Sequence, residues 1–117
     1  MDIEEIRTYC LAKKASEESM PFDDSVLVFK VMGKIFACIF LNIPDRLVLK
    51  CDPDYAIWLR DFYPAIEPAW HFNKKYWNQH KISKLGDALL VKLIDHSYEE
   101  VLKKISRKDR AVYDSLP

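Results

Sequence analysis

The segment from Trp70 to Lys84 combines residue types that can bind nucleic acids. It holds four lysines, four aromatic residues, two histidines and two asparagines, and it contains no acidic residue. Lysines can neutralise a phosphate backbone, and flat rings between them can stack on bases. The same composition also fits an amphipathic hairpin whose rings enter the core and whose lysines extend into water. The residues alone leave both interpretations open.

A second basic cluster lies at residues 103–110, where five basic residues accompany one aspartate. The chain has no net charge, but residues 1–24 hold three bases and seven acids, whereas residues 70–117 hold ten bases and six acids. Such asymmetry permits a neutral protein to have an anion-binding face. If the two basic segments share one face, we expect contacts with several phosphates and an affinity that falls steeply with salt.

Other chemistry has less support in the residues. His71, His80 and His96 lack the spacings of zinc motifs, and no cysteine joins them in a recognisable pattern. The acidic residues fall mostly at expected helix starts and turns, where capping accounts for them. No serine lies in a nucleophile-elbow sequence. We therefore expect no metal, no cofactor and no enzymatic activity.

Length and composition indicate one domain over residues 1–117, with 50% hydrophobic residues to build its core. Cys10, Cys38 and Cys51 are odd in number and far apart, so we expect buried free thiols and a reducing compartment. The longest apolar run, residues 35–41, is too short to span a bilayer. The acidic N-terminus lacks the basic start of a signal peptide. We expect a cytoplasmic monomer without membrane contact.

Hydrophobic periodicity predicts an α+β fold, in which an antiparallel sheet of about five strands lies between helical ends. The expected order is a helix over 2–14, a loop over 15–25, strands over 26–31, 34–41 and 46–51, a short helix ended by Pro64, a hairpin of strands 69–72 and 76–82, and helices over the remainder.

Short local motifs position these elements. Met32-Gly33 predicts a tight hairpin turn, and Asp52-Pro53 predicts a helix start. The short helix after Pro53 is expected to carry Tyr55, Ala56, Leu59 and Phe62.

Two further capping signals lie near the C-terminus. The sequence Ser97-Tyr-Glu-Glu100 is typical of a capping box and predicts that the helix breaks or kinks near His96. Ser106 is expected to cap a last helix.

Read from end to end, the sequence resembles the MmcQ/YjbR family of small bacterial proteins. The resemblance rests on motifs that follow one another in the family's order and spacing over nearly the whole chain. They are Arg7 with Tyr9-Cys10-Leu11, Met20-Pro21-Phe22, Phe29-Lys30-Val31, Gly33-Lys34, Phe36-Ala37, Leu49-Lys50-Cys51-Asp52-Pro53, Leu59-Arg60, Tyr63-Pro64, Pro68 to Asn78, Ser97-Tyr98 with Val101, Lys108 and Arg110.

This resemblance implies the frataxin-like (CyaY-like) α/β sandwich and a role in DNA binding. One departure is the pair Asp23-Asp24 after Phe22, where many members of the family have a glycine. The added acidity argues against contact between that loop and DNA. The polar surface that the family shares falls on Lys50, His71, Asn73, Lys74, Trp77 and Asn78.

Our leading hypothesis is a non-enzymatic DNA-binding domain. Its lysines would contact phosphates, its rings and amides would stack on bases or reach base edges, and the neighbouring Trp70, Phe72 and Tyr76 would support it from the core. The predicted contact residues are Lys50, His71, Asn73, Lys74, Lys75, Trp77, Asn78, Lys81 and Lys84.

The alternative hypothesis is a protein-interaction or small-ligand module with a pocket around Trp77, Asn78 and His71. An enzyme of unknown reaction, using that same pocket, is a third possibility.

Overall fold

A computed structural model, which describes all 117 residues, contains four α-helices, one 3₁₀ helix and six strands. The helices are α1 (Ile3–Leu11), α2 (Pro53–Phe62), η1 (Ile82–Lys84), α3 (Asp87–Leu102) and α4 (Arg107–Ser115). The strands are β1 (Ser16–Ser19), β2 (Val26–Val31), β3 (Lys34–Phe40), β4 (Arg46–Lys50), β5 (Ile66–Pro68) and β6 (Trp77–Lys81). They form one antiparallel sheet in the order β1-β2-β3-β4-β6-β5. The predicted α+β class is confirmed, with one strand more than expected.

The additional strand is β1, which lies in the region predicted to be a loop. It pairs with β2 so that Ser16 lies opposite Val31 and Ser19 opposite Val28. Its sequence, Ser-Glu-Glu-Ser, contains no apolar residue and therefore gives no strand signal. Charged residues are typical of an edge strand, because they discourage pairing with another chain. The expectation of a loop over residues 15–25 is wrong for this segment.

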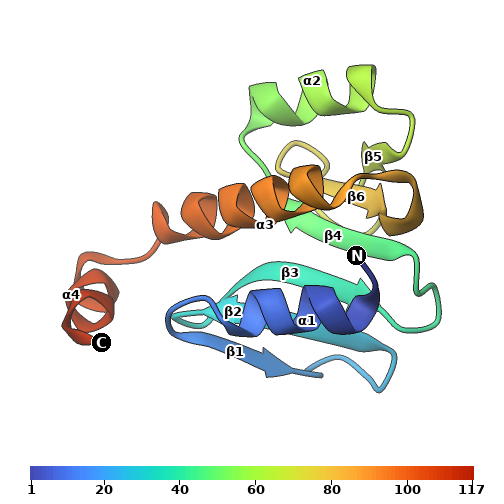
Figure 1. Cartoon of the computed structure of the whole chain (residues 1–117). Helices are drawn as coiled ribbons and strands as arrows, with labels where there is room; N and C mark the ends of the chain where they lie inside the picture. Colours follow the sequence, from blue (N-terminus) through green and yellow to red (C-terminus); the bar gives the residue numbers. More distant parts are fainter.

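Helices cover one face of the sheet. α1 and α3 both lie in front of it, and α2 lies beyond the end formed by β5 and β6 (Figure 1). Alternate residues of the central strands, such as Phe29, Ile39 and Leu49, point into the main core beneath the helices. A second, smaller cluster contains no helical residue and consists of Val26, Val28, Cys38, Val48 and Ala69. The opposite face of the sheet is therefore free of helices. No helix is long and apolar enough to cross a membrane.

Ser97 attaches α3 to the two central strands. The helix continues without a break through His96, so a break there is wrong. The fully buried Ser97 hydroxyl donates to the carbonyl of Phe36 (2.6 Å) and accepts the N–H of Lys50 (2.8 Å). Beside it, His96 Nε2 accepts the N–H of Asp52 (3.1 Å). The capping-box sequence thus serves tertiary contacts with β3 and with the end of β4.

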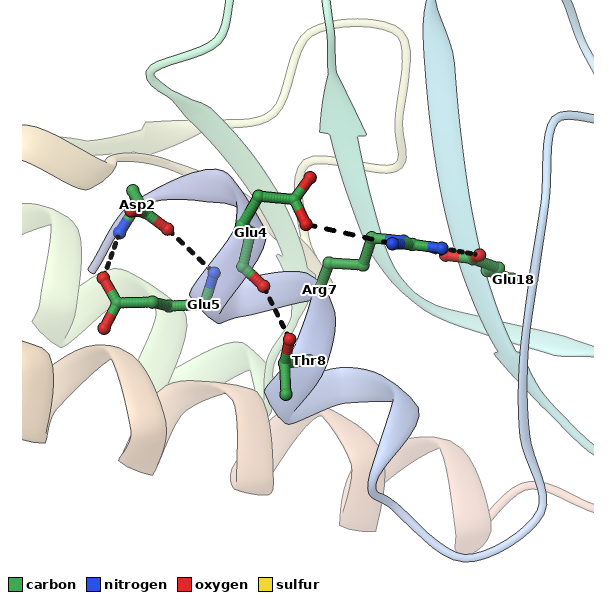
Figure 2. A network of polar contacts seen from close by, with 6 residues as sticks. All are labelled: Asp2, Glu4, Glu5, Arg7, Thr8 and Glu18. Atoms are coloured by element: carbon green, nitrogen blue, oxygen red, sulfur yellow. Dashed lines mark hydrogen bonds and ion pairs between the residues drawn. The ribbon is translucent and has the colours of Figure 1, made fainter.

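A polar network fixes α1 against β1 (Figure 2). The Asp2 carboxylate accepts the N–H of Glu5 (2.8 Å), and the Glu5 carboxylate accepts the N–H of Asp2 (3.1 Å), which completes a capping box. Arg7 Nε donates to Glu18 on β1 (2.7 Å). The acidic start of the chain is therefore engaged in capping and ion pairing.

The local turn and capping motifs are confirmed. Met32 and Gly33 have φ angles of +49° and +78°, as a tight turn between β2 and β3 requires. Asp52 caps α2 by accepting the N–H of Tyr55 (3.1 Å), and Ser106 caps α4.

The second predicted hairpin is displaced along the chain. Its first strand, β5, ends at Pro68 instead of beginning at Ala69. The connection to β6 is therefore an eight-residue loop over 69–76, which we call the 69–76 loop.

Replacing Ser97 by alanine should lower the free energy of unfolding by about 1–3 kcal/mol, because a buried N–H and a buried carbonyl both lose their partner. Urea denaturation followed by circular dichroism measures this change. Ser115→Ala is the control, because the exposed Ser115 hydroxyl bonds only to the Val112 carbonyl of its own helix. It should change stability by less than about 0.5 kcal/mol. Equal stability of Ser97→Ala and the unmodified protein would contradict the proposed attachment.

Candidate nucleic-acid interface

The 69–76 loop lies against the helix-free face of the sheet. Ala69 is fully buried in the small cluster. Phe72 packs edge-on against Phe40, with ring centroids 6.5 Å apart, and lies 5.2 Å from the ring of Trp77. These contacts explain why the central residues of this face are buried without a helix above them.

Asn73 stabilises the turn of the loop through hydrogen bonds. Its side-chain oxygen accepts the N–H of Lys75 (3.1 Å), and its backbone carbonyl accepts the N–H groups of Tyr76 and Trp77 (3.0 Å each). Such an Asx turn is a common use of asparagine in loops. Asn73 is exposed, as a contact residue must be, but its amide oxygen already has a partner within the loop.

The tip of the loop presents rings and charges to solvent. Trp70 is 57% exposed, so the expectation that it supports the loop from the core is wrong. Lys74 Nζ lies 4.4 Å from the centroid of the Trp70 ring, a cation–π contact. His71 and Lys75 are also exposed. The φ angle of His71 is +68°, a left-handed conformation that costs a residue with a side chain about 1 kcal/mol or more.

Trp77 and Asn78 follow each other on β6 and lie in different environments. Trp77 is half-buried on the helix-free face. Asn78 is completely buried: its Nδ2 donates to the Ala56 carbonyl (3.3 Å), and its Oδ1 accepts from Arg60 (3.1 Å). Asn78 therefore attaches α2 to β6. The ligand contact predicted for it is not available in this structure, because the side chain does not reach solvent.

Lys50 lies directly opposite Trp77, at the end of β4. The pKa of this half-buried lysine is lowered from its ordinary value, first by burial and then by the positive charges of Lys104 and Lys34. No carboxylate lies within 4.0 Å of any of these three residues. We call Lys34, Lys50 and Lys104 the lysine cluster.

Lys50 is related to a residue of each basic segment of the sequence. Lys104 belongs to residues 103–110, and Lys50 is the register partner of a residue in the other segment. Glu100 raises the pKa of Lys50, but its carboxylate is paired with Lys103 at 2.6 Å. The positive charge of the cluster is therefore only partly balanced.

Lys81 and Lys84 lie apart from the lysine cluster. A strand rises about 3.3 Å per residue, so Lys81 is about 13 Å from Trp77 along β6. Its partner on β4 is Arg46. Lys84 is exposed in η1. The predicted contact residues thus divide into one group around Trp77 and the 69–76 loop and a second group at the far end of β6.

The three histidines lie in separate environments. His71 is exposed in the loop, whereas the ring of His96 on α3 lies edge-on to Tyr55, with centroids 5.0 Å apart. His80 is 2% exposed, and its Nδ1 donates to the Leu47 carbonyl (3.0 Å). Burial lowers the pKa of His80 to about 4. No group of three or more His, Cys, Asp or Glu side chains is arranged to hold a metal ion.

The three cysteines are buried free thiols, as predicted. Burial raises the pKa of Cys10, Cys38 and Cys51 to about 12. None of them is therefore a thiolate nucleophile near neutral pH.

An aromatic stack on α2 was not predicted. Trp58 and Phe62 are 52% and 63% exposed, and their rings stack with centroids 5.0 Å apart. Phe62 lies on this helix, as predicted, and it is exposed because the helix ends there and the next residue, Tyr63, packs against the main core instead. The sequence correctly places Ala56 and Leu59 on this helix, where both are buried. It gives no signal for where the last turn of the helix leaves the core.

Comparison with known proteins yields one family and a shared fold. The model of the YjbR family matches residues 11–100. The chain is 35% identical over 95 residues to an uncharacterized protein of Escherichia coli O157:H7, YbdF, covering 77% of this chain and 75% of that protein. It is 29% identical to YjbR of Escherichia coli K12, also uncharacterized, over 99% of this chain and 100% of that protein.

Two solved structures have the same fold. A Deinococcus radiodurans protein with a DUF419 domain superposes with a TM-score of 0.90 at 34% identity, over 99% of this chain and 89% of that one. A Pseudomonas syringae protein superposes with a TM-score of 0.74 at 22% identity, over 86% and 98% of the two chains. The likeness to the frataxin-like sandwich stays a prediction.

Acidification should destabilise the protein between about pH 6.5 and pH 4, because His80 is neutral in the folded state while the unfolded chain binds a proton near pH 6.5. The unfolded state therefore binds more protons in this range. The free energy of unfolding should fall with decreasing pH by about 1.4 kcal/mol per unit, about 3 kcal/mol in total. The lowered pKa of His96 acts in the same direction.

Urea denaturation at a series of pH values measures this slope. In His80→Gln, which cannot titrate at this position, the slope should be distinctly smaller. The same slope in both proteins would show that another group controls the acid sensitivity.

Proposed function

Because the chain belongs to the YjbR family and its lysine cluster is only partly balanced by acidic residues, we propose that it binds DNA without catalysing a reaction. The proposed surface consists of the lysine cluster, Trp77 and the exposed tip of the 69–76 loop. Its relatives are bacterial. Bacterial DNA lies in the cytoplasm, so the proposal includes a cytoplasmic location.

The observation that carries this proposal is the environment of Lys50. Its ammonium group is half-buried, and the charges of Lys34 and Lys104 act on it. Like charges that act on one another raise the free energy of the unbound protein, and a phosphate backbone would relieve this repulsion. A partly buried charge is also screened less by salt than an exposed one. A phosphate would therefore gain the most favourable electrostatic free energy of binding at Lys50.

The exposed rings favour single strands over duplexes. Trp70 has the larger free ring surface, while Trp77 is half-buried against Phe72. A base stacked on Trp70 would lie beside the ammonium group of Lys74, which already covers part of that ring. Stacking on an aromatic ring requires an unpaired base. We therefore expect single-stranded DNA to bind more tightly than duplex of the same length.

A hollow beside the loop supports small-ligand binding as a second candidate function. It has a volume of about 290 Å³ and is lined by Phe22, Val26, Phe40, His71 and Phe72. Of the residues predicted to form a pocket, it contains His71 but not Trp77 or Asn78. An apolar hollow with one imidazole fits an uncharged ring or a short alkyl group. Such a ligand would leave the lysine cluster free.

Labelled single-stranded DNA should bind at low salt, with an affinity that falls as salt increases. If about four lysines contact phosphates, the slope of log K against log salt should be about −3 for single strands. Reversing charge in Lys74→Glu with Lys75→Glu, or in Lys104→Glu alone, should weaken binding about tenfold or more. Fluorescence anisotropy measures the affinity, and quenching of tryptophan fluorescence reports stacking.

The matched control is Lys92→Glu, which makes the same charge change at an exposed position on α3, outside the proposed surface. Its affinity for DNA should equal that of the unmodified protein. Absence of binding at low salt, or an equal loss in Lys92→Glu, would rule out the proposed interface.

A further inference from the structure

A second hollow lies at the far end of the β4–β6 pair from Trp77. Its volume is about 180 Å³, and the strand residues Arg46, Lys81, Gln79 and Glu67 contribute to its walls together with Asp45. The register places Arg46 opposite Lys81 and Gln79 opposite Glu67, all on the helix-free face. Residues of three neighbouring strands, β4, β6 and β5, therefore form walls of the hollow, and no residue of the 69–76 loop lines it.

The guanidinium group of Arg46 has fewer partners than its chemistry allows. It stacks on the ring of Phe40, 4.4 Å from the centroid, and one Nη donates a long hydrogen bond to the Trp70 carbonyl (3.5 Å). Its Nε is buried and has no hydrogen-bond partner. No carboxylate lies within 4.0 Å of it. A guanidinium has five N–H donors, so most of the donors of Arg46 have no acceptor within the protein.

Lys81 places a second cation directly opposite Arg46. Like charges directly opposite each other on neighbouring strands destabilise a sheet. Arg46 and Lys81 occupy such a pair of positions, and neither forms an ion pair. The register therefore places two cations side by side without an ion-pair partner.

The acidic residues of the hollow are engaged elsewhere. Glu67 accepts a hydrogen bond from Gln79 Nε2 (3.1 Å). Asp45 accepts the N–H and the hydroxyl of Ser83 (2.6 and 2.8 Å), and these bonds lower the pKa of its carboxyl group. Neither carboxylate forms an ion pair with Arg46 or Lys81. At longer range, the charge of Glu67 acts to raise the pKa of Arg46, and the charge of Lys81 acts to lower the pKa of Asp45. The two cations are the groups left free for a ligand.

We propose that this hollow binds the oxyanion group of a small molecule, a carboxylate or a phosphate, between Arg46 and Lys81. The guanidinium fork donates to two oxygens of the anion, and the flexible ammonium group of Lys81 closes over it. The small volume admits the anionic group and a few further atoms. This site goes beyond DNA binding, because it lies about 13 Å along β6 from Trp77 and takes a free small molecule.

Titration of the isotope-labelled protein, observed by ¹H–¹⁵N correlation spectra, tests the site. Sodium phosphate is added in one series and sodium acetate in another, at constant ionic strength maintained with sodium chloride. We expect the Arg46 Nε–H signal and the backbone amide signals of Gln79 and Lys81 to shift together and to saturate. The series that saturates at the lower concentration identifies phosphate or carboxylate as the preferred group.

Two variants and one control make the test specific. Lys81→Gln removes one cation from an exposed position, and Arg46→Lys keeps the charge but removes the fork. Each should raise the dissociation constant about tenfold, the effect of losing one charge-assisted hydrogen bond. Lys92→Gln, with the same loss of charge on α3, should leave it unchanged. Circular dichroism verifies that each variant is folded.

Three results would overturn the proposal. They are shifts that grow linearly without saturation in both series, the same dissociation constant in Lys81→Gln as in the unmodified protein, and an equal weakening in Lys92→Gln.

Discussion

The Ser97 hydroxyl joins one helix to two strands: it donates to the carbonyl of Phe36 on β3 and accepts the N–H of Lys50 on β4. Together with His96, which accepts the N–H of Asp52, it fixes the point at which β4 ends and α2 begins. The lysine cluster depends on this contact, because the residue whose N–H is bonded to α3 also carries the central ammonium group. A change at Ser97 would therefore alter stability and the position of Lys50 together.

Helices cover only one face of the sheet. On the other face, the 69–76 loop packs against the central strands. The loop buries the central residues with Ala69 and Phe72 and keeps Trp70 and Lys74 in solvent. It also holds His71 in a left-handed conformation, which is unfavourable for that residue type. Strain of this kind persists only where the surrounding contacts maintain it, and it is concentrated at functional segments. The loop thus covers the small cluster while its rings and charges remain exposed to solvent.

Local signals in the sequence predict much of the fold and little of the site. Met32-Gly33 and Asp52-Pro53 determine backbone geometry through the residues themselves, so their turn and helix start are correctly predicted. Ser97 begins a sequence that fits a capping box, but only the tertiary fold shows that its hydroxyl bonds to two strands. Asn78 has the residue type of a base-edge contact, yet the packing of α2 buries it. Arg46 carries no signal in the sequence, because its lack of a partner follows from strand register.

The distribution of charge explains how a chain with no net charge can bring basic side chains close together. The acidic N-terminal segment folds into α1 and β1, at the edge of the sheet opposite β5, where Glu18 pairs with Arg7 (Figures 1 and 2). On β4 and β6 the register brings Arg46 opposite Lys81 at one end and places Lys50 near other lysines at the opposite end. Electrostatic interactions between surface groups are screened beyond about 10 Å, so distant carboxylates do not neutralise these ends. Local strand pairing, and not total charge, therefore determines where basic side chains meet on this sheet, and these are the positions of both proposed anion sites.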